Sequence, residues 1–235
     1  MNQQVEFLKE TDLFRGLSEQ VIAEELLPHG QTAEIGKEIY LLRPSDRLDY
    51  FGIVLEGMIY TMHIFGDGNH SIIDHIGPGE MFGSDLIYTR TRISPYHVVT
   101  ASEIKMLRFP AALLTEHNLL PERTRHQIKE NLLKMISQDN MRREYRLAIL
   151  SQKGLRERVM TYLSMQATKR HKNTFTVPFS RENLAAYLCV NRSALSHELS
   201  MMQKEGLISF HKNTFSINQE RIQEDEIYTV QNTDS

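Results

Sequence analysis

The chain has 235 residues, of which 40% are hydrophobic and 24% are charged, a composition typical of globular proteins with one large or two modest domains. No apolar run approaches the length of a membrane span, and the first residues do not have the pattern of a secretory signal peptide. The single cysteine, Cys189, excludes an intramolecular disulfide and an iron–sulfur cluster held by this chain alone, so we expect a cytoplasmic protein.

The net charge of −3 hides an uneven distribution along the chain. Residues 151–217 carry ten Lys and Arg against four Asp and Glu, which gives +6, whereas residues 1–150 carry sixteen against twenty-one. The remaining residues, 218–235, carry one against five. A basic segment within an otherwise acidic protein favours a module that binds a polyanion, although such differences also arise by chance.

The first half of the chain predicts short helices followed by many short strands. Residues 5–28 have an amphipathic pattern that is interrupted at Gly16 and Pro28. From Thr32 to Phe109, β-rich runs alternate with turns rich in Gly, Pro, Asp and Asn, which predicts an antiparallel barrel or jelly roll. The expected strands are residues 39–42, 50–55, 58–64, 71–76, 96–101 and 104–109.

Residues 122–150 contain neither Gly nor Pro and predict one long helix. Spacings of three and four residues define an apolar seam that is typical of a two-stranded coiled coil, so we expect a homodimer. Asn140 falls at a seam position where a buried amide fixes the register of the two helices, whereas Arg143 places a charged side chain in the seam. A helix that packs only within its own subunit is the alternative. The seam consists of Leu133, Ile136, Asn140, Arg143, Leu147 and Leu150.

The last third of the chain predicts a winged helix-turn-helix. Residues 151–154 interrupt the long helix and form a candidate hinge, after which a further helix begins at Leu155. Residues 180–207 predict two short helices joined by a tight turn, and residues 207–210 and 214–217 predict a two-stranded wing. The alternative is an ordinary helical hairpin with a solvated polar face.

Helical spacing divides the second of these helices into two faces. Ser180 and Asn191 are suitable N-caps for the first and the second helix. Leu195, Leu199 and Met202 are expected to face inward, which leaves the polar residues of the N-terminal half facing outward. Cys189, in the turn, is expected to be a small buried residue.

Several segments resemble the CRP/FNR superfamily of bacterial transcription regulators. VLEGMIYTMHIFGDG (54–68) resembles its strand–glycine–strand pattern, and IGPGEMFGSD (76–85) its glycine-rich turn. LRERVMTYL (155–163) and FSRENLAAYLCVNRSALSHELSMMQKEGLI (179–208) are similar to the helix after the hinge and to the DNA-binding motif. Together these segments extend the resemblance over nearly the whole chain.

The resemblance implies an α+β protein in three parts. Residues 1–121 would form an effector-sensing barrel with N-terminal helices, 122–150 a dimerisation helix, and 151–235 a winged helix-turn-helix domain. It also implies a homodimer that binds a two-fold symmetric site in double-stranded DNA, and that contacts RNA polymerase if it activates transcription.

The second helix of the motif carries the candidate base-reading residues. Arg192 matches a family arginine and can bond guanine O6 and N7 together. Ser193 stands where the family often has glutamate, and His197 where it usually has arginine, so the target sequence should differ from the usual family half-site. Ser196 is a further candidate for a base contact. The candidate phosphate contacts are Arg181, Asn191 and Lys212, with a solvated wing tip as the alternative for Lys212.

Members of the family that bind cyclic nucleotides hold the ribose with a glycine–glutamate pair and the cyclic phosphate with an arginine–serine pair. Here the glutamate is replaced by Ser84, and the arginine–serine place falls at Pro95-Tyr96. Proline offers neither positive charge nor an N–H donor, so we expect no cyclic AMP binding through the usual contacts unless a nearby arginine swings in. The candidate effector pocket comprises Gly83, Ser84, Arg90, Arg92 and Tyr96.

Other ligands and other functions remain as alternatives. Haem would need an axial histidine, but no second axial ligand is identifiable, so no cofactor or metal is expected. A metal-dependent cupin-like enzyme would need His-x-His ligands, which do not occur, so we expect no enzyme. A ligand-sensing dimer without DNA binding is the remaining alternative, and the +6 segment argues against it. The barrel histidines considered are His63, His70, His75 and His97.

Overall fold

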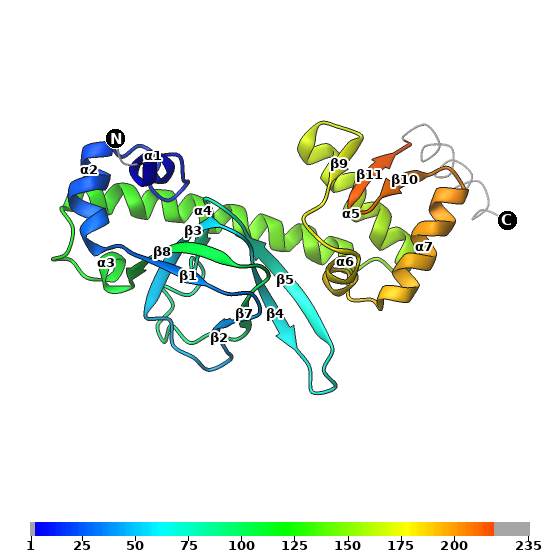
Figure 1. The fold of residues 1–235 in the computed structure, drawn as a ribbon, viewed down its shortest axis with the longest axis horizontal. Helices are drawn as coiled ribbons and strands as arrows, with labels where there is room; N and C mark the ends of the chain where they lie inside the picture. The colour runs from blue at the N-terminus through cyan, green and yellow to red at the C-terminus, as the bar shows by residue number, and fades with distance from the viewer. Residues whose placement is uncertain (1–2, 219–235) are drawn as a thin grey trace. The chain divides into compact units, whose positions relative to one another are not determined.

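The computed structural model describes residues 3–218, and the chain divides into two compact units between Arg142 and Arg143 (Figure 1). The first unit opens with α1 (Gln3–Lys9) and α2 (Glu19–Val21), which continues as a π turn (Ile22–Leu26) and a 3-10 turn (Leu27–His29). The prediction of short helices is confirmed, but the predicted breaks are not, because α1 ends at Lys9, well before Gly16, and Pro28 lies within the 3-10 turn.

Eight strands of the first unit form two four-stranded antiparallel sheets. One sheet has the order β1-β8-β3-β6 and the other β2-β7-β4-β5. The prediction of an antiparallel barrel or jelly roll within an α+β fold is confirmed. The fold is a jelly-roll sandwich, because in residues 3–218 no strand pairing joins the two sheets. The eight strands of the two sheets are β1 (Gln31–Ile35), β2 (Tyr40–Leu42), β3 (Tyr50–Glu56), β4 (Ile59–Ile64), β5 (His70–Ile76), β6 (Met81–Phe82), β7 (His97–Thr100) and β8 (Ile104–Pro110).

The glycine between β3 and β4 shows why the strand–glycine–strand pattern needs that residue. Gly57 has φ +86°, and a Cβ atom there would lie 2.2 Å from the carbonyl oxygen of Glu103. An L-residue is strained in this backbone conformation, and the clash is with backbone that cannot rotate away. The glycine therefore allows β3 and β4 to turn closely beside the loop that precedes β8.

We expect Gly57→Ala to lower the free energy of unfolding by at least about 2 kcal/mol, measured by urea denaturation, because backbone strain and a steric clash act together. Gly68 is the matched control, since its φ is +84° but a Cβ atom there would meet nothing within 4 Å. Gly68→Ala should cost only about 1 kcal/mol. Equal losses for the two variants would contradict the role of the close approach to Glu103.

The long helix α4 (Glu122–Leu150) follows the short α3 (Ala112–Thr115), and its bounds are those predicted. Ile128 and Leu132 are buried in the core of the first unit, and the side-chain amide of Asn131 donates to the carbonyls of Leu13 and Arg15. One face of the first half of α4 therefore belongs to the core of the first unit.

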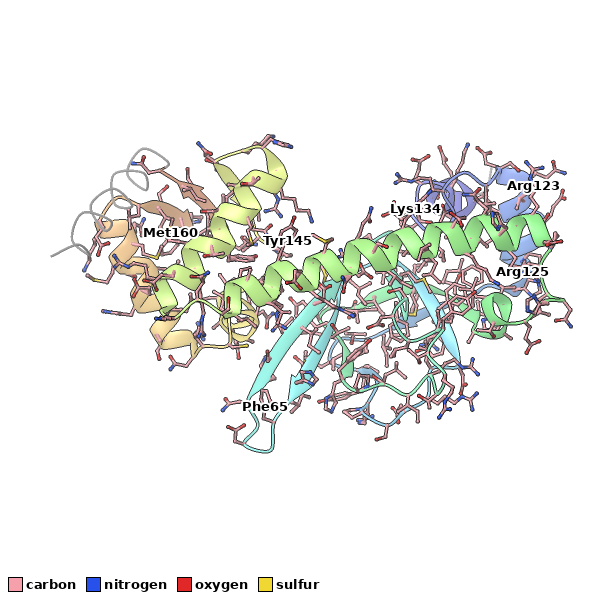
Figure 2. The ribbon with its side chains drawn as sticks, turned by 180° about the vertical axis from the view of Figure 1, so that it is seen from behind. Phe65, Arg123, Arg125, Lys134, Tyr145 and Met160 are labelled. Carbon is pink, nitrogen blue, oxygen red and sulfur yellow. The ribbon has the colours of Figure 1, made fainter. Side chains whose placement is uncertain are left out.

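Large side chains are exposed on both units, and several of them lie on α4. Phe65, at the tip of the β4–β5 hairpin, is 53% exposed, and Tyr145 on α4 is 53% exposed (Figure 2). Two residues of the expected seam, Leu133 and Leu147, are each 61% exposed. Ile136 differs from them because it packs partly against the core of its own unit. The seam residues Asn140 and Arg143 are exposed and Leu150 is half-buried.

The second unit has the winged helix-turn-helix order that the sequence predicts. After α5 (Leu155–Arg170) come β9 (Thr174–Thr176), α6 (Arg181–Tyr187), α7 (Arg192–Lys204) and the two wing strands. Strands β10 (Ile208–His211), β11 (Thr214–Ile217) and β9 form one antiparallel sheet in the order β10-β11-β9. Val159 and Leu163 of α5 are buried in this unit together with the inner face of α7.

Candidate nucleic-acid interface

The second helix of the motif, α7, has one buried and one exposed face. Leu195, Leu199 and Met202 are completely buried, as their spacing predicts. Arg192 and His197 are exposed on the outward side. The N-terminal half of α7 therefore offers polar side chains to a partner while its apolar residues hold the helix in place. Ser193 is exposed and Ser196 is half-buried.

The N-terminus of α7 is capped in the predicted way. Asn191 Oδ1 accepts from the backbone N–H of Ala194 at 2.7 Å and from the hydroxyl of Ser193 at 2.9 Å. Ser180 caps α6 in the same manner, since its Oγ accepts from the N–H of Asn183 at 3.2 Å. Capping fixes the start of α7, and with it the position from which Arg192 projects. In addition to cationic side chains, the free backbone N–H groups and the dipole at a helix N-terminus favour binding of a phosphate.

Arg181 holds the wing against α6. Its Nη2 donates to the carbonyl of Lys212 at 3.1 Å, and its guanidinium lies 4.7 Å from the ring centre of Phe210 and 5.4 Å from that of Phe215. Burial lowers the pKa of Arg181 from its ordinary value. Lys212 is exposed in the wing turn, where its φ is +54°.

The turn between α6 and α7 is contacted by two arginines that the sequence analysis missed. The guanidinium of Arg146 lies 5.1 Å from the ring centre of Tyr187, and its Nη2 is 4.0 Å from Cys189 Sγ. Arg158 donates to the carbonyl of Gln152 at 3.1 Å and reaches that of Leu188 at 3.5 Å. No local pattern indicates the contacts of Arg146 with Cys189 and of Arg158 with Leu188, because they join residues 43 and 30 positions apart in the chain.

Cys189 is exposed, and the prediction that it is buried is wrong. It follows Leu188, which caps α6, and its φ is +56°. A residue in this left-handed conformation ends the helix and turns its side chain away from the core. The tight turn, rather than the small size of the side chain, therefore decides where the thiol lies.

The candidate effector residues of the first unit already have partners. Ser84 Oγ donates to Asp139 Oδ2 of α4 at 3.3 Å, and the hydroxyl of Tyr96 lies 2.7 Å from both carboxylate oxygens of Asp85. Gly83 has φ +90°. Ser84 and Tyr96 thus both engage carboxylates, which are unsuitable neighbours for a buried phosphate. Arg90 is exposed and Arg92 is half-buried.

A group of charged residues joins α4 to the strands beside this region. Arg142 pairs with Glu80 at 3.2 Å and with Asp139, and Asp74 lies close enough to interact with it. Burial raises the pKa of Asp74 above its ordinary value, an effect that the positive charge of Arg142 opposes. No spacing in the sequence indicates that Arg142 pairs with Glu80, because the two residues are 62 positions apart in the chain.

The four histidines considered as haem or metal ligands do not come together at one site. His75 Nδ1 lies 3.5 Å from an oxygen of Asp74, and the ring of His97 meets that of Tyr40 edge-on at 5.7 Å. His63 is exposed and His70 is half-buried. Within residues 3–218, no three His, Cys, Asp or Glu side chains come together as a metal-binding group.

Comparison with known families and proteins supports this organisation. The family model for the cyclic nucleotide-binding domain matches residues 33–116, and that for the Crp-like helix-turn-helix domain matches residues 157–221. The transcriptional activator protein FnrL of Cereibacter sphaeroides is 23% identical over 202 residues, which cover 82% of this chain and 77% of that protein. The transcriptional regulator LdrP of Thermus thermophilus is 25% identical over 180 residues, covering 74% of this chain and 84% of that protein.

Solved structures share the fold. FixK2 of Bradyrhizobium japonicum matches with a TM-score of 0.66 and 18% identity, covering 83% of this chain and 96% of that one. The c-di-GMP responsive global regulator CLP of Xanthomonas campestris matches with a TM-score of 0.67 and 15% identity, covering 83% of this chain and 97% of that one. Among residues 3–218 there is no helix with the length and apolarity that a membrane crossing requires. The order of the two matched domains, the curated relatives and the shared fold show that this chain belongs to the CRP/FNR family of transcription regulators.

Proposed function

We propose that this protein is a cytoplasmic homodimer that binds a specific two-fold symmetric DNA site and regulates transcription. The observation that carries the proposal is the capped, outward-facing N-terminal half of α7, with Arg192 exposed, in a segment that carries a net charge of +6 over residues 151–217. Such a helix end can enter the major groove, where an arginine can bond guanine O6 and N7. If the protein activates transcription, RNA polymerase is a further partner.

The roles divide between base reading and positioning. Arg192, Ser193 and His197 project from exposed positions of α7, and Ser196 lies beside them. The proposed phosphate contacts are Asn191 at the start of α7 and Lys212 in the wing turn, both of which are exposed. Phosphate contacts add affinity without sequence information, and they make binding fall steeply with salt. Arg181, which is half-buried, is the third proposed phosphate contact.

The homodimer would form along the exposed face of α4. Leu133 and Leu147 occupy equivalent positions two heptads apart, and each is 61% exposed in the single chain. Large apolar side chains in such a row favour contact with a second helix. Two copies related by a two-fold axis would present their recognition helices about 34–36 Å apart, which is one turn of DNA.

Selection of bound duplexes from a random-sequence pool tests the proposed function. We expect the enriched sequences to contain two inverted half-sites, with their centres separated by about one turn of the double helix. We also expect the affinity for the selected duplex to exceed that for a scrambled duplex by about a thousandfold or more. A pool that yields no shared sequence would overturn the proposal.

The first unit would sense a small molecule, and cyclic AMP bound through the usual contacts is not that molecule. The positions that would hold the ribose and the phosphate carry Ser84 and Pro95-Tyr96, and both Ser84 and Tyr96 engage carboxylates. An effector can bias DNA binding only by binding two arrangements of the protein with different affinity.

We expect isothermal titration with cyclic AMP to give no saturable heat up to about 1 mM ligand, because a buried phosphate without a cationic partner is unfavourable. Asp85→Asn removes the negative charge that lies beside Tyr96. This variant should also fail to bind cyclic AMP if binding fails because the pocket has no cationic side chain for the phosphate. A dissociation constant in the micromolar range for the unaltered protein would contradict this prediction.

A further inference from the structure

Arg156 joins the first turn of α5 to the recognition helix. Its Nε donates to Glu198 Oε1 at 2.7 Å, and its Nη1 and Nη2 donate to the two carboxylate oxygens of Glu205 at 2.6 and 2.9 Å. One planar guanidinium therefore engages two carboxylates, one of them with paired bonds. This fork-to-fork geometry fixes direction as well as distance.

The charges of Arg156 and Glu205 both lie at helix ends where the helix dipole disfavours them. Arg156 is a cation in the first turn of α5, and Glu205 is an anion at the C-cap of α7. The positive end of a helix repels the former and the negative end of a helix repels the latter. Each charge is instead satisfied by the other, and Arg156 holds the pKa of Glu205 below its ordinary value. The placement is thus explained by the contact between the helices rather than by helix formation.

The two carboxylates are spaced to control the direction of α7. Glu198 and Glu205 are seven residues apart, so their Cα atoms lie on one side of the helix about 10 Å apart along its axis, and both side chains reach the one guanidinium of Arg156. Two successive turns of α7 are therefore tied to the start of α5, which resists rotation of α7 about its axis more than a single contact would. The outward-facing Arg192 is carried by the same rigid helix.

We propose that Arg156, together with Glu198 and Glu205, is a positioning group that sets the orientation of α7 in the major groove, and so the ability of the protein to discriminate its target from other DNA. The proposal rests on the proposed function. Base-edge hydrogen bonds need an accurate approach, whereas phosphate contacts tolerate small rotations. Loss of the group should therefore weaken specific binding far more than non-specific binding.

Two single substitutions separate positioning from general electrostatics. Arg156→Gln removes a positive charge and Glu205→Gln removes a negative one. If only net charge mattered, the first would weaken and the second would strengthen binding to any DNA. If the group positions α7, both variants should lose about tenfold in the ratio of affinities for the selected duplex and a scrambled duplex, since one good base contact is worth that much.

Matched controls and a double variant complete the test. Lys169→Gln and Glu157→Gln remove the same charges from exposed positions of α5, and we expect their affinity ratios to change less than twofold. The double variant Arg156→Gln/Glu205→Gln should lose no more than Arg156→Gln alone, because that single substitution already breaks the contacts with both carboxylates. Arg156→Lys should recover part of the ratio, since a point charge can satisfy one carboxylate but cannot form the fork.

Thermal unfolding distinguishes positioning from a merely structural role. Exposed ion pairs stabilise little, so Arg156→Gln should lower Tm by about 5 °C or less, and DNA binding is measured well below that midpoint. Affinity ratios that move in opposite directions in the two single variants, or that stay unchanged, would overturn the positioning role. Failure of the unaltered protein to prefer any sequence would instead overturn the proposed function, and the positioning role with it.

Discussion

Replacing Arg192 by alanine should remove most of the preference of the protein for its target site. A bidentate arginine–guanine contact contributes about 1–3 kcal/mol of discrimination, and a homodimer makes it twice. We therefore expect Arg192→Ala to weaken binding to the selected duplex by about 30-fold or more, measured by fluorescence anisotropy at fixed salt. Binding to a scrambled duplex should weaken far less, because phosphate contacts there carry no base information.

Lys204 provides the matched control for this substitution. It lies in the last turn of the same helix and is exposed, so Lys204→Ala removes an equal charge without removing a residue from the N-terminal half of α7. We expect a small loss that is similar for the selected and the scrambled duplex. If the two variants lost specific affinity equally, Arg192 would act through charge alone and not through base contact.

Charges placed on the α4 seam should separate the dimer and abolish tight DNA binding. In the variant Leu133→Glu/Leu147→Glu, two like charges would face their copies across the coiled coil. We expect monomers by sedimentation velocity, and a loss of about 100-fold or more in affinity for a two-half-site duplex. Without the partner, each half-site is bound separately and the second binding event is no longer intramolecular.

The matching control lies on the same helix, off the seam. Met141 is 50% exposed and Tyr145 is 53% exposed, so they resemble the seam leucines in exposure but occupy other heptad positions. Met141→Glu/Tyr145→Glu should remain dimeric and keep its DNA affinity within a few-fold. A dimer that survives in the seam variant but not in the control would place the subunit contact on a different face of α4.

Local sequence patterns predicted most elements because those patterns arise from local causes. The bounds of α4 agree with the prediction, since a run without Gly or Pro is bounded by Pro121 and by the turn after Leu150. The inner face of α7 followed from its helical period. Two strands of the first unit were missed: β1 lies at the edge of its sheet and is mostly exposed, and β6 has only two residues. Neither strand has enough alternation to produce a detectable pattern.

The sequence predicts which residues of the candidate site are exposed, but it does not predict which distant residues they or their neighbours contact. Exposure of Arg192 follows from its place on α7. By contrast, the bond from Ser84 to Asp139 joins residues 55 positions apart, and that from Arg156 to Glu205 joins residues 49 apart. No spacing rule within one helix or strand can indicate such pairs, because they depend on how separate elements pack.

The order of the elements, the helix caps and the polar outward face of α7 could be predicted from the amino-acid sequence, since each depends on residues within a few positions of one another. The separation of the two sheets, the contacts of Ser84 and Tyr96 with carboxylates, and the pairing of Arg156 with α7 depend instead on how distant elements pack. The physical reason is that hydrogen bonds and ion pairs need atoms within about 3 Å, and for residues far apart in the chain folding alone provides that proximity.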